Sequence, residues 1–192
     1  MSAATVMLLL AMLALHASFT WARFAVFRID GATPPGVRLI EVGAAASIAV
    51  GASLVAGRDG DGGLLDVVGA LLGATSAALF AWGLRSIRRQ QFSAAFSEDL
   101  PILLVRHGPY RFIRHPFYLA YLLAHAIPMA ASRSPWALPG LLLMGGIYLR
   151  AAQLEERKFL ASPLAAAWLE HQQRTGRFLP RWQSLRAKEA AR

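Results

Sequence analysis

The chain has 192 residues, of which 56% are hydrophobic and only 16% are charged, against roughly 25% charged residues in soluble domains. A soluble domain is disfavoured because it needs a charged surface, and a disordered chain is excluded because this chain is far too apolar. The net charge of +9 is compatible with nucleic acid, an anionic membrane surface or acidic ligands. With no cysteine in the sequence, disulfides and thiolate metal sites are excluded.

Apolar stretches without charge follow one another along the chain. The first covers residues 3–22, about the length that a helix needs to cross a bilayer, and a cleaved signal peptide is disfavoured because no basic region precedes it. Others cover residues 42–57, 67–84, 116–132 and 134–149, and the tight connection around residue 133 makes the last two a helical hairpin. The sequence predicts one all-α, polytopic membrane domain with about five transmembrane helices, or four as the alternative.

The basic residues are distributed unequally between the ends of these stretches. If residues 23–38, 85–116 and 150–192 lie on one side, every Lys and Arg except Arg58 and Arg133 lies there. The positive-inside rule then predicts an N-terminus outside and a C-terminus in the cytoplasm. We expect an integral protein of the bacterial inner membrane with a cytoplasmic C-terminal helix and a basic tail at residues 183–192. Because the basic residues flank the spans, no nucleic-acid binding is expected.

A dense polar segment precedes the fourth apolar stretch. Residues 98–121 contain three Arg, two His, three Pro and three Tyr. The Gly108-Pro109 pair predicts a turn, and Pro116 suits the first turn of a helix. Arg114 and His115 are therefore expected at the N-terminus of that helix, where exposed N–H groups and cations attract a carboxylate or phosphate.

A second polar cluster follows the fifth apolar stretch, with Arg150, Glu155, Glu156 and Arg157. The hairpin brings this cluster to the same membrane level as Arg114, and ionisable groups at membrane depth indicate a functional site. The alternative is a structural interface in which the glutamates pair with Arg111 or Arg114. A metal site is not expected, because His107 and His115 lack helical same-face spacing and a third ligand.

Three strings in this region carry a resemblance to a known family. They are GPYRFIRHPFY at residues 108–118, EE at 155–156 and RFLP at 177–180. Together they resemble the isoprenylcysteine carboxyl methyltransferase family, integral-membrane enzymes that use S-adenosylmethionine. The resemblance covers residues 98–182, which are the expected catalytic region, and leaves residues 1–97 as a scaffold of three spans.

The resemblance also implies the site residues. Arg150 is the nearest match to the arginine that the family associates with the methyl-accepting carboxylate, and Glu155 and Arg114 are expected beside it as catalytic residues. The cofactor site would be formed by Ile102, Leu103, Leu104, Val105, Tyr110, His115, Pro116, Phe117, Tyr118 and Glu156. The expected cofactor is S-adenosylmethionine, without a metal.

The expected function is methyl transfer to a lipophilic acceptor that enters from the bilayer between helices. A carboxylate is the first expectation for that acceptor, either of the isoprenylcysteine type or an isoprenoid acid. A phospholipid N-methyltransferase and an NADPH-dependent enone or sterol-type reductase are alternatives within similar membrane enzymes. A membrane assembly or sensor protein without enzymatic activity is the third class. The sequence selects no oligomeric state.

Overall fold

The computed structural model describes residues 1–28, 32–59, 63–87, 92–93 and 100–181, and the expected basic tail at 183–192 lies outside these ranges. Most of the described residues are helical. The elements in chain order are α1 (Ala3–Ala25), β1 (Phe27–Arg28), α2 (Pro35–Ala56), α3 (Leu64–Ser86), β2 (Phe92–Ser93), the 3-10 helix η1 (Gly108–Arg111), α4 (Pro116–Ala131), the 3-10 helix η2 (Pro135–Ala137), α5 (Leu138–Leu160) and α6 (Ala165–Arg174). The two short strands pair in parallel.

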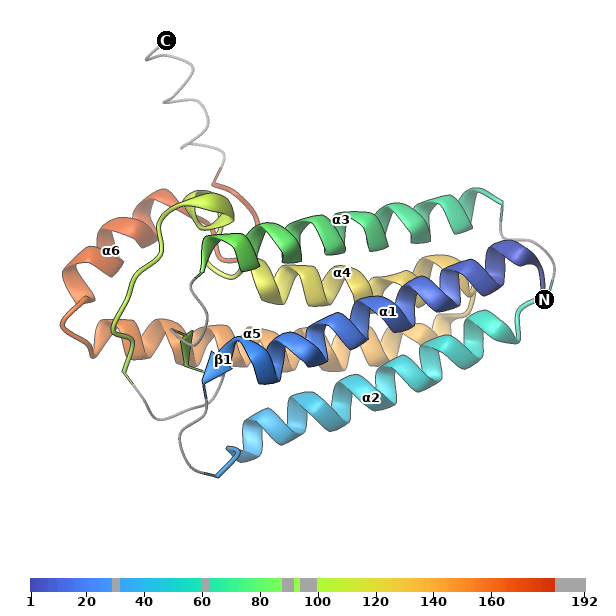
Figure 1. Ribbon diagram of the computed structural model, residues 1–192, viewed down its shortest axis with the longest axis horizontal. Helices are drawn as coiled ribbons and strands as arrows, with labels where there is room; N and C mark the ends of the chain where they lie inside the picture. Colours follow the sequence, from blue (N-terminus) through green and yellow to red (C-terminus); the bar gives the residue numbers. More distant parts are fainter. Residues whose placement is uncertain (29–31, 60–62, 88–91, 94–99, 182–192) are drawn as a thin grey trace, which may run out of the picture.

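Helices α1 to α5 run lengthwise beside one another, and α6 lies at one end of this bundle (Figure 1). Within the described ranges, four helical segments are long and apolar enough to cross a membrane: Ala3–Ala25, Pro35–Ala56, Leu64–Ser86 and Pro135–Leu160. The fifth, α4, has 16 residues and so spans only about 24 Å of the roughly 30 Å hydrocarbon core. The predicted polytopic all-α fold and the α4–α5 hairpin are confirmed, while four helices rather than five meet the length requirement.

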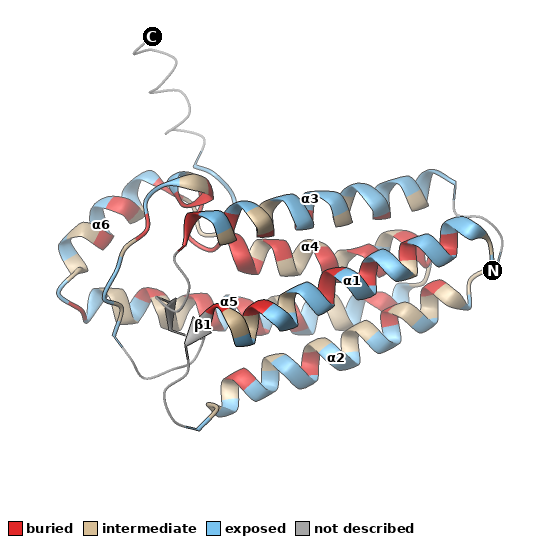
Figure 2. Cartoon of the chain, viewed as in Figure 1, coloured by how far each residue is buried: buried red, intermediate tan, exposed pale blue. Residues whose placement is uncertain are grey.

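The bundle is apolar outside as well as inside. Large side chains such as Met7, Leu71 and Leu142 are exposed, and exposed residues cover the outward faces of α1, α2 and α3 (Figure 2). Such a surface suits contact with lipid, because lipid tails are as apolar as leucine. The sequence therefore contains few charged residues because the outer faces of the helices suit contact with lipid rather than with water.

Small residues let the helices approach one another closely. A Cβ placed on Gly51 of α2 would lie 2.5 Å from Cγ of Pro128 in α4, and one on Gly83 of α3 would lie 3.1 Å from Phe117. The hydroxyl of Ser76 donates a hydrogen bond of 2.6 Å to the carbonyl oxygen of Ala120. These contacts fix α4 in the middle of the bundle, against both α2 and α3.

The two ends of the bundle differ in their polar residues. At the end that contains the N-terminus, the buried side chain of Arg58 forms an ion pair with Asp66 and donates hydrogen bonds to Thr5 and to the carbonyl oxygen of Ala131. The opposite end contains residues 100–115, α6 and the C-terminal end of α5 (Figure 1). That end gathers the polar residues that the sequence singles out.

We expect Gly51→Ala to destabilise the protein by about 1–3 kcal/mol, because the added methyl group overlaps the rigid ring of Pro128. Thermal unfolding of the purified protein in detergent measures the change. Gly146→Ala is the matched control, because its Cβ meets nothing within 4 Å. Equal unfolding temperatures for the two variants would contradict the proposed close packing of α2 on α4.

Candidate functional site

The segment that leads into α4 is held in place by a glycine turn. Gly108 has a φ of +60°, and a Cβ at this position would lie 1.9 Å from Oγ of Ser86 at the end of α3. Only glycine combines this backbone conformation with such a close approach. The turn continues into η1, which buries Tyr110. The predicted Gly108-Pro109 turn is thereby confirmed, and it places the following residues at the end of the bundle.

The residues after η1 pair with the C-terminal segment of the chain. The backbone N–H of Arg114 donates to the carbonyl oxygen of Gly176 at 2.9 Å, and that of His115 donates to Arg177 at 3.1 Å. In return, the N–H of Gly176 donates to Phe112 at 3.2 Å. This short parallel pairing joins two segments that are about sixty residues apart in the chain. Both are therefore held over the end of α5.

Glu156 of α5 is the anchor of this arrangement. One of its oxygens, Oε1, lies 3.0 Å from Nε of Arg114, 3.2 Å from Nε2 of His115 and 3.0 Å from Nε of Arg177. The other oxygen accepts a hydrogen bond of 2.7 Å from Nη2 of Arg177. The side chain of Glu156 is only 7% exposed, so its charge depends on these partners rather than on water. We call Arg114, His115, Glu156 and Arg177 the anchor cluster.

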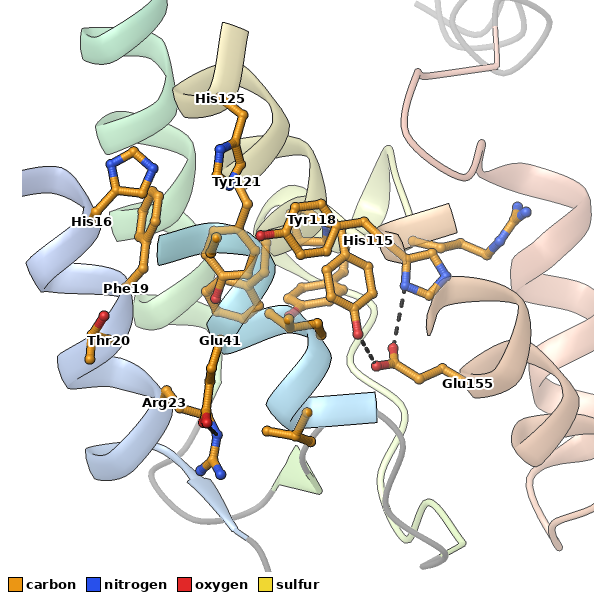
Figure 3. A pocket seen from close by; sticks show the side chains of 18 of the residues that line it. His16, Phe19, Thr20, Arg23, Glu41, His115, Tyr118, Tyr121, His125 and Glu155 are labelled. Carbon is orange, nitrogen blue, oxygen red and sulfur yellow. Dashed lines mark hydrogen bonds and ion pairs between the residues drawn. The ribbon is translucent and has the colours of Figure 1, made fainter. Parts of the chain in front are cut away.

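Glu155, the neighbour of Glu156 in the chain, has a different environment. It accepts a hydrogen bond from the hydroxyl of Tyr118 and lies 3.4 Å from Nδ1 of His115. Its side chain is 30% exposed, and Figure 3 shows it beside the cavity together with Tyr118 and His115. His115 therefore stands between two carboxylates, one in the anchor cluster and one at the cavity.

This position determines the protonation of His115. Burial lowers the pKa of His115, but the hydrogen bonds to Glu155 and Glu156 and their charges outweigh burial and raise the pKa above its ordinary value. His171 of α6 is the opposite case, because burial and the charges of Arg106 and Arg114 lower its pKa to about 4. The site thus contains one histidine whose pKa is raised and one whose lowered pKa keeps it neutral at physiological pH.

The cavity beside these residues has a volume of about 520 Å³ and extends from the loop before α4 to the inner faces of α1 and α2. Its polar wall residues at one end are Arg114, His115, Glu155 and His171, and aromatic rings line the passage beyond them. Tyr118 stacks with Tyr148 at 5.5 Å between ring centroids, and Tyr121 contacts Phe19 of α1 at 4.6 Å. The cavity therefore has a charged end at His115 and Glu155, from which an aromatic passage leads to the inner faces of α1 and α2.

Most of the residues that the resemblance implies come together at this cavity. Those in its wall are Leu104, Val105, Tyr110, Arg114, His115, Pro116, Phe117, Tyr118 and Glu155. Ile102 and Leu103 are instead exposed, at 82% and 41%. Glu156 lies behind the wall, in the anchor cluster. Only part of the expected cofactor set thus faces the cavity.

Arg150 is not brought to the site. It is exposed on α5 and does not contribute to the cavity wall. Helical geometry explains this, because five residues of an α-helix separate Arg150 from Glu155 by about 140° around the axis. Arg150 thus lies exposed on α5, outside the wall of this cavity, and its expected contact with the methyl acceptor stays a prediction.

Several residues of the site were not predicted. Arg177 belongs to the RFLP string and pairs with Glu156. The opposite charges of these two residues are the signal in the sequence that could have indicated the pair. Trp168 and His171 of α6 line the cavity, and Trp168 stacks on Phe159 at 4.3 Å. Arg23 and Glu41 also line it, from helices in which the sequence shows no chemical motif.

In the described part of the chain, no group of three or more His, Asp or Glu side chains is arranged to hold a metal ion. Neither a scan against protein-family models nor a search of curated proteins finds a match to this chain.

We expect the folded state to lose stability in a pH window that begins at about pH 6.5, as His115 loses its proton. The folded protein binds this proton more tightly than the unfolded chain, so the stabilisation is present below the unfolded pKa of about 6.5 and is lost as the pH rises through the higher folded pKa. His171, whose pKa is lowered, affects stability only below this window. Thermal unfolding across the window measures the effect.

His115→Gln should flatten this pH dependence, whereas His107→Gln, which removes an exposed histidine of the same loop, should retain it. The same slope in His115→Gln as in the unmodified protein would contradict the proposed ion pairs of His115.

Proposed function

We propose that the protein transfers a methyl group from S-adenosylmethionine to a lipophilic acceptor, foremost a carboxylate. The observation that carries this proposal is the cavity, which joins a charged end at His115 and Glu155 to a largely apolar, aromatic passage between membrane helices. Its volume of about 520 Å³ falls in the range of roughly 300–1,000 Å³ that is typical of small-molecule sites. A polar cofactor and an apolar acceptor need such a site with two chemically different halves.

The wall residues at the charged end fit the groups of the cofactor. Glu155 can accept hydrogen bonds from an ammonium or from ribose hydroxyls. The faces of Tyr110, Phe117 and Tyr118 can stack on an adenine or attract a sulfonium. We assign the cofactor contact to Glu155 rather than Glu156, because the oxygens of Glu156 already accept hydrogen bonds from Arg114 and Arg177.

The reaction makes modest chemical demands on the protein. When held by Glu155, Tyr110, Phe117 and Tyr118, the cofactor would supply a methyl group on a positively charged sulfur. The acceptor carboxylate would take the methyl carbon, and the electron pair of the broken carbon–sulfur bond would stay on sulfur. A carboxylate is already ionised at neutral pH, so no side chain has to remove a proton. The chain has to align the two reactants and exclude water. The buried aromatic rings of Phe117 and Tyr118 suit the second task.

We further propose that the site faces the cytoplasm of a bacterial inner membrane and that the N-terminus lies outside. The support is the distribution of charge, because most basic residues in the described part of the chain lie towards the end that contains the site. Arg58, one of the two exceptions, is neutralised by Asp66. In this orientation the cofactor enters from the cytoplasm and the acceptor enters from the bilayer.

The proposal predicts saturable binding of S-adenosylmethionine to the purified protein in nanodiscs, measured by isothermal titration calorimetry. Glu155→Gln should weaken this binding about tenfold, because it removes a charged hydrogen-bond acceptor. Arg157→Gln, two positions along α5 and exposed, is the control and should bind as the unmodified protein does. Incubation with a membrane lipid extract and methyl-labelled cofactor should give a labelled lipid.

An absence of saturable binding in nanodiscs with lipid present would contradict the proposed function. Oxidation of NADPH by an enone lipid, without label transfer, would favour the reductase instead. Binding that is unchanged in Glu155→Gln would contradict the role given to Glu155.

A further inference from the structure

The cavity has a second charged group, far along the chain from the first. Arg23, in the last turn of α1, and Glu41 of α2 both belong to its wall. Figure 3 shows the two side chains together, on the opposite side of the cavity from His115 and Glu155. Nε of Arg23 lies 3.4 Å from Oε1 of Glu41. This ion pair joins two helices that otherwise present mostly apolar residues to the cavity, with His16 and Thr20 of α1 as the polar exceptions.

The guanidinium of Arg23 is poorly satisfied. Its Nε is inaccessible to solvent and has no hydrogen-bond partner, and among the described residues its ionic partner is Glu41 alone. The guanidinium lies 5.2 Å from the ring centroid of Phe24, which attracts a cation but accepts no strong hydrogen bond. Leaving a buried N–H donor without an acceptor is costly. The unpartnered Nε–H of Arg23 therefore indicates a place for a further acceptor.

The other arginine in the cavity wall is in the opposite state. Arg114 donates to Glu156 and to the carbonyl oxygens of Gln172 and Thr175. It therefore holds the anchor cluster together and has little capacity for a ligand. Of the two arginines in the wall, Arg23 is the one with a buried N–H donor that has no hydrogen-bond partner.

We propose that Arg23 binds the oxyanion head group of the methyl acceptor, and that the carboxylate of Glu41 holds this place until the acceptor displaces it. The acceptor is then an aliphatic carboxylate or phosphate whose chain lies against Val37, Ile40 and Ile48 in the α2 wall. An incoming oxyanion replaces one carboxylate by another, so the charge at Arg23 stays balanced. The term acceptor rests on the proposed function, but the binding of an amphiphilic anion at Arg23 does not.

The experiment measures equilibrium binding of three probes to the protein in detergent at about pH 8, where carboxylates are ionised. The probes are oleate, oleyl phosphate and the uncharged oleyl alcohol. Arg23→Gln should weaken the binding of at least one anionic probe about tenfold or more and leave the alcohol unchanged. The probe that loses affinity identifies the head group as carboxylate or phosphate. Arg38→Gln, which removes an exposed arginine of α2, is the matched control and should have no effect.

Glu41→Gln provides a test in the opposite direction. It removes the competing carboxylate, so the anionic probe should bind more tightly, a gain that a misfolded variant cannot show. The proposal is overturned if no anionic probe binds saturably, if Arg23→Gln and Arg38→Gln bind it equally, or if Glu41→Gln does not bind it more tightly.

Calorimetry with S-adenosylmethionine on the same samples separates this inference from the proposed function. Anion binding that depends on Arg23 without any cofactor binding would refute methyl transfer but support the site. Cofactor binding without anion binding at Arg23 would refute the site and leave methyl transfer in place.

Discussion

The site depends on the charge of Glu156, a buried carboxylate whose partners are two arginines and a histidine. Arg114 and His115 reach it from the start of α4, and Arg177 reaches it from the segment after α6. Burying a carboxylate costs several kcal/mol unless its partners are well placed, and removing one partner leaves charges without compensation. Glu156 therefore makes the position of three chain segments interdependent. The backbone pairing of Arg114 and His115 with residues 176–177 follows the same constraint.

Because Glu156 is held by the anchor cluster, the two adjacent glutamates have different roles. Successive residues of an α-helix point about 100° apart, so Glu156 faces the C-terminal segment while Glu155 faces the cavity. His115 contacts both carboxylates, so its protonation affects the anchor cluster and the cavity at the same time. The aromatic passage then connects Glu155 to the inner faces of α1 and α2, where Arg23 and Glu41 lie. An acceptor with a charged head and an apolar chain would thus find a partner for each part.

The sequence predicts the helices well and the assembly of the site only in part. Long apolar runs define α1, α2, α3 and α5, because about twenty apolar residues suffice to specify a membrane helix. The structural roles of Gly108 and Pro116 are also predicted correctly, because a glycine in a tight turn and a proline at the start of a helix act on their own backbone. Arg177 was not assigned a role, because its pairing with Glu156 depends on a chain reversal through α6 that no local pattern encodes. Arg23 and Glu41 lie 18 positions apart in different helices, so only the packing of α1 on α2 reveals them. Arg150 is the opposite case, because it is close to Glu155 in the sequence but lies on a different face of the same helix.

The most direct test of this account is hydrogen–deuterium exchange of the protein in nanodiscs, with and without S-adenosylhomocysteine as a stable product analogue. The account predicts slower exchange on binding in residues 104–118 and in the segments around Glu155 and His171, which surround the charged end of the cavity. Exchange at the opposite end of the bundle, around Arg58 and Asp66, should stay unchanged. Identical exchange with and without the analogue, or protection confined to the opposite end, would contradict the assignment of this cavity as the cofactor site.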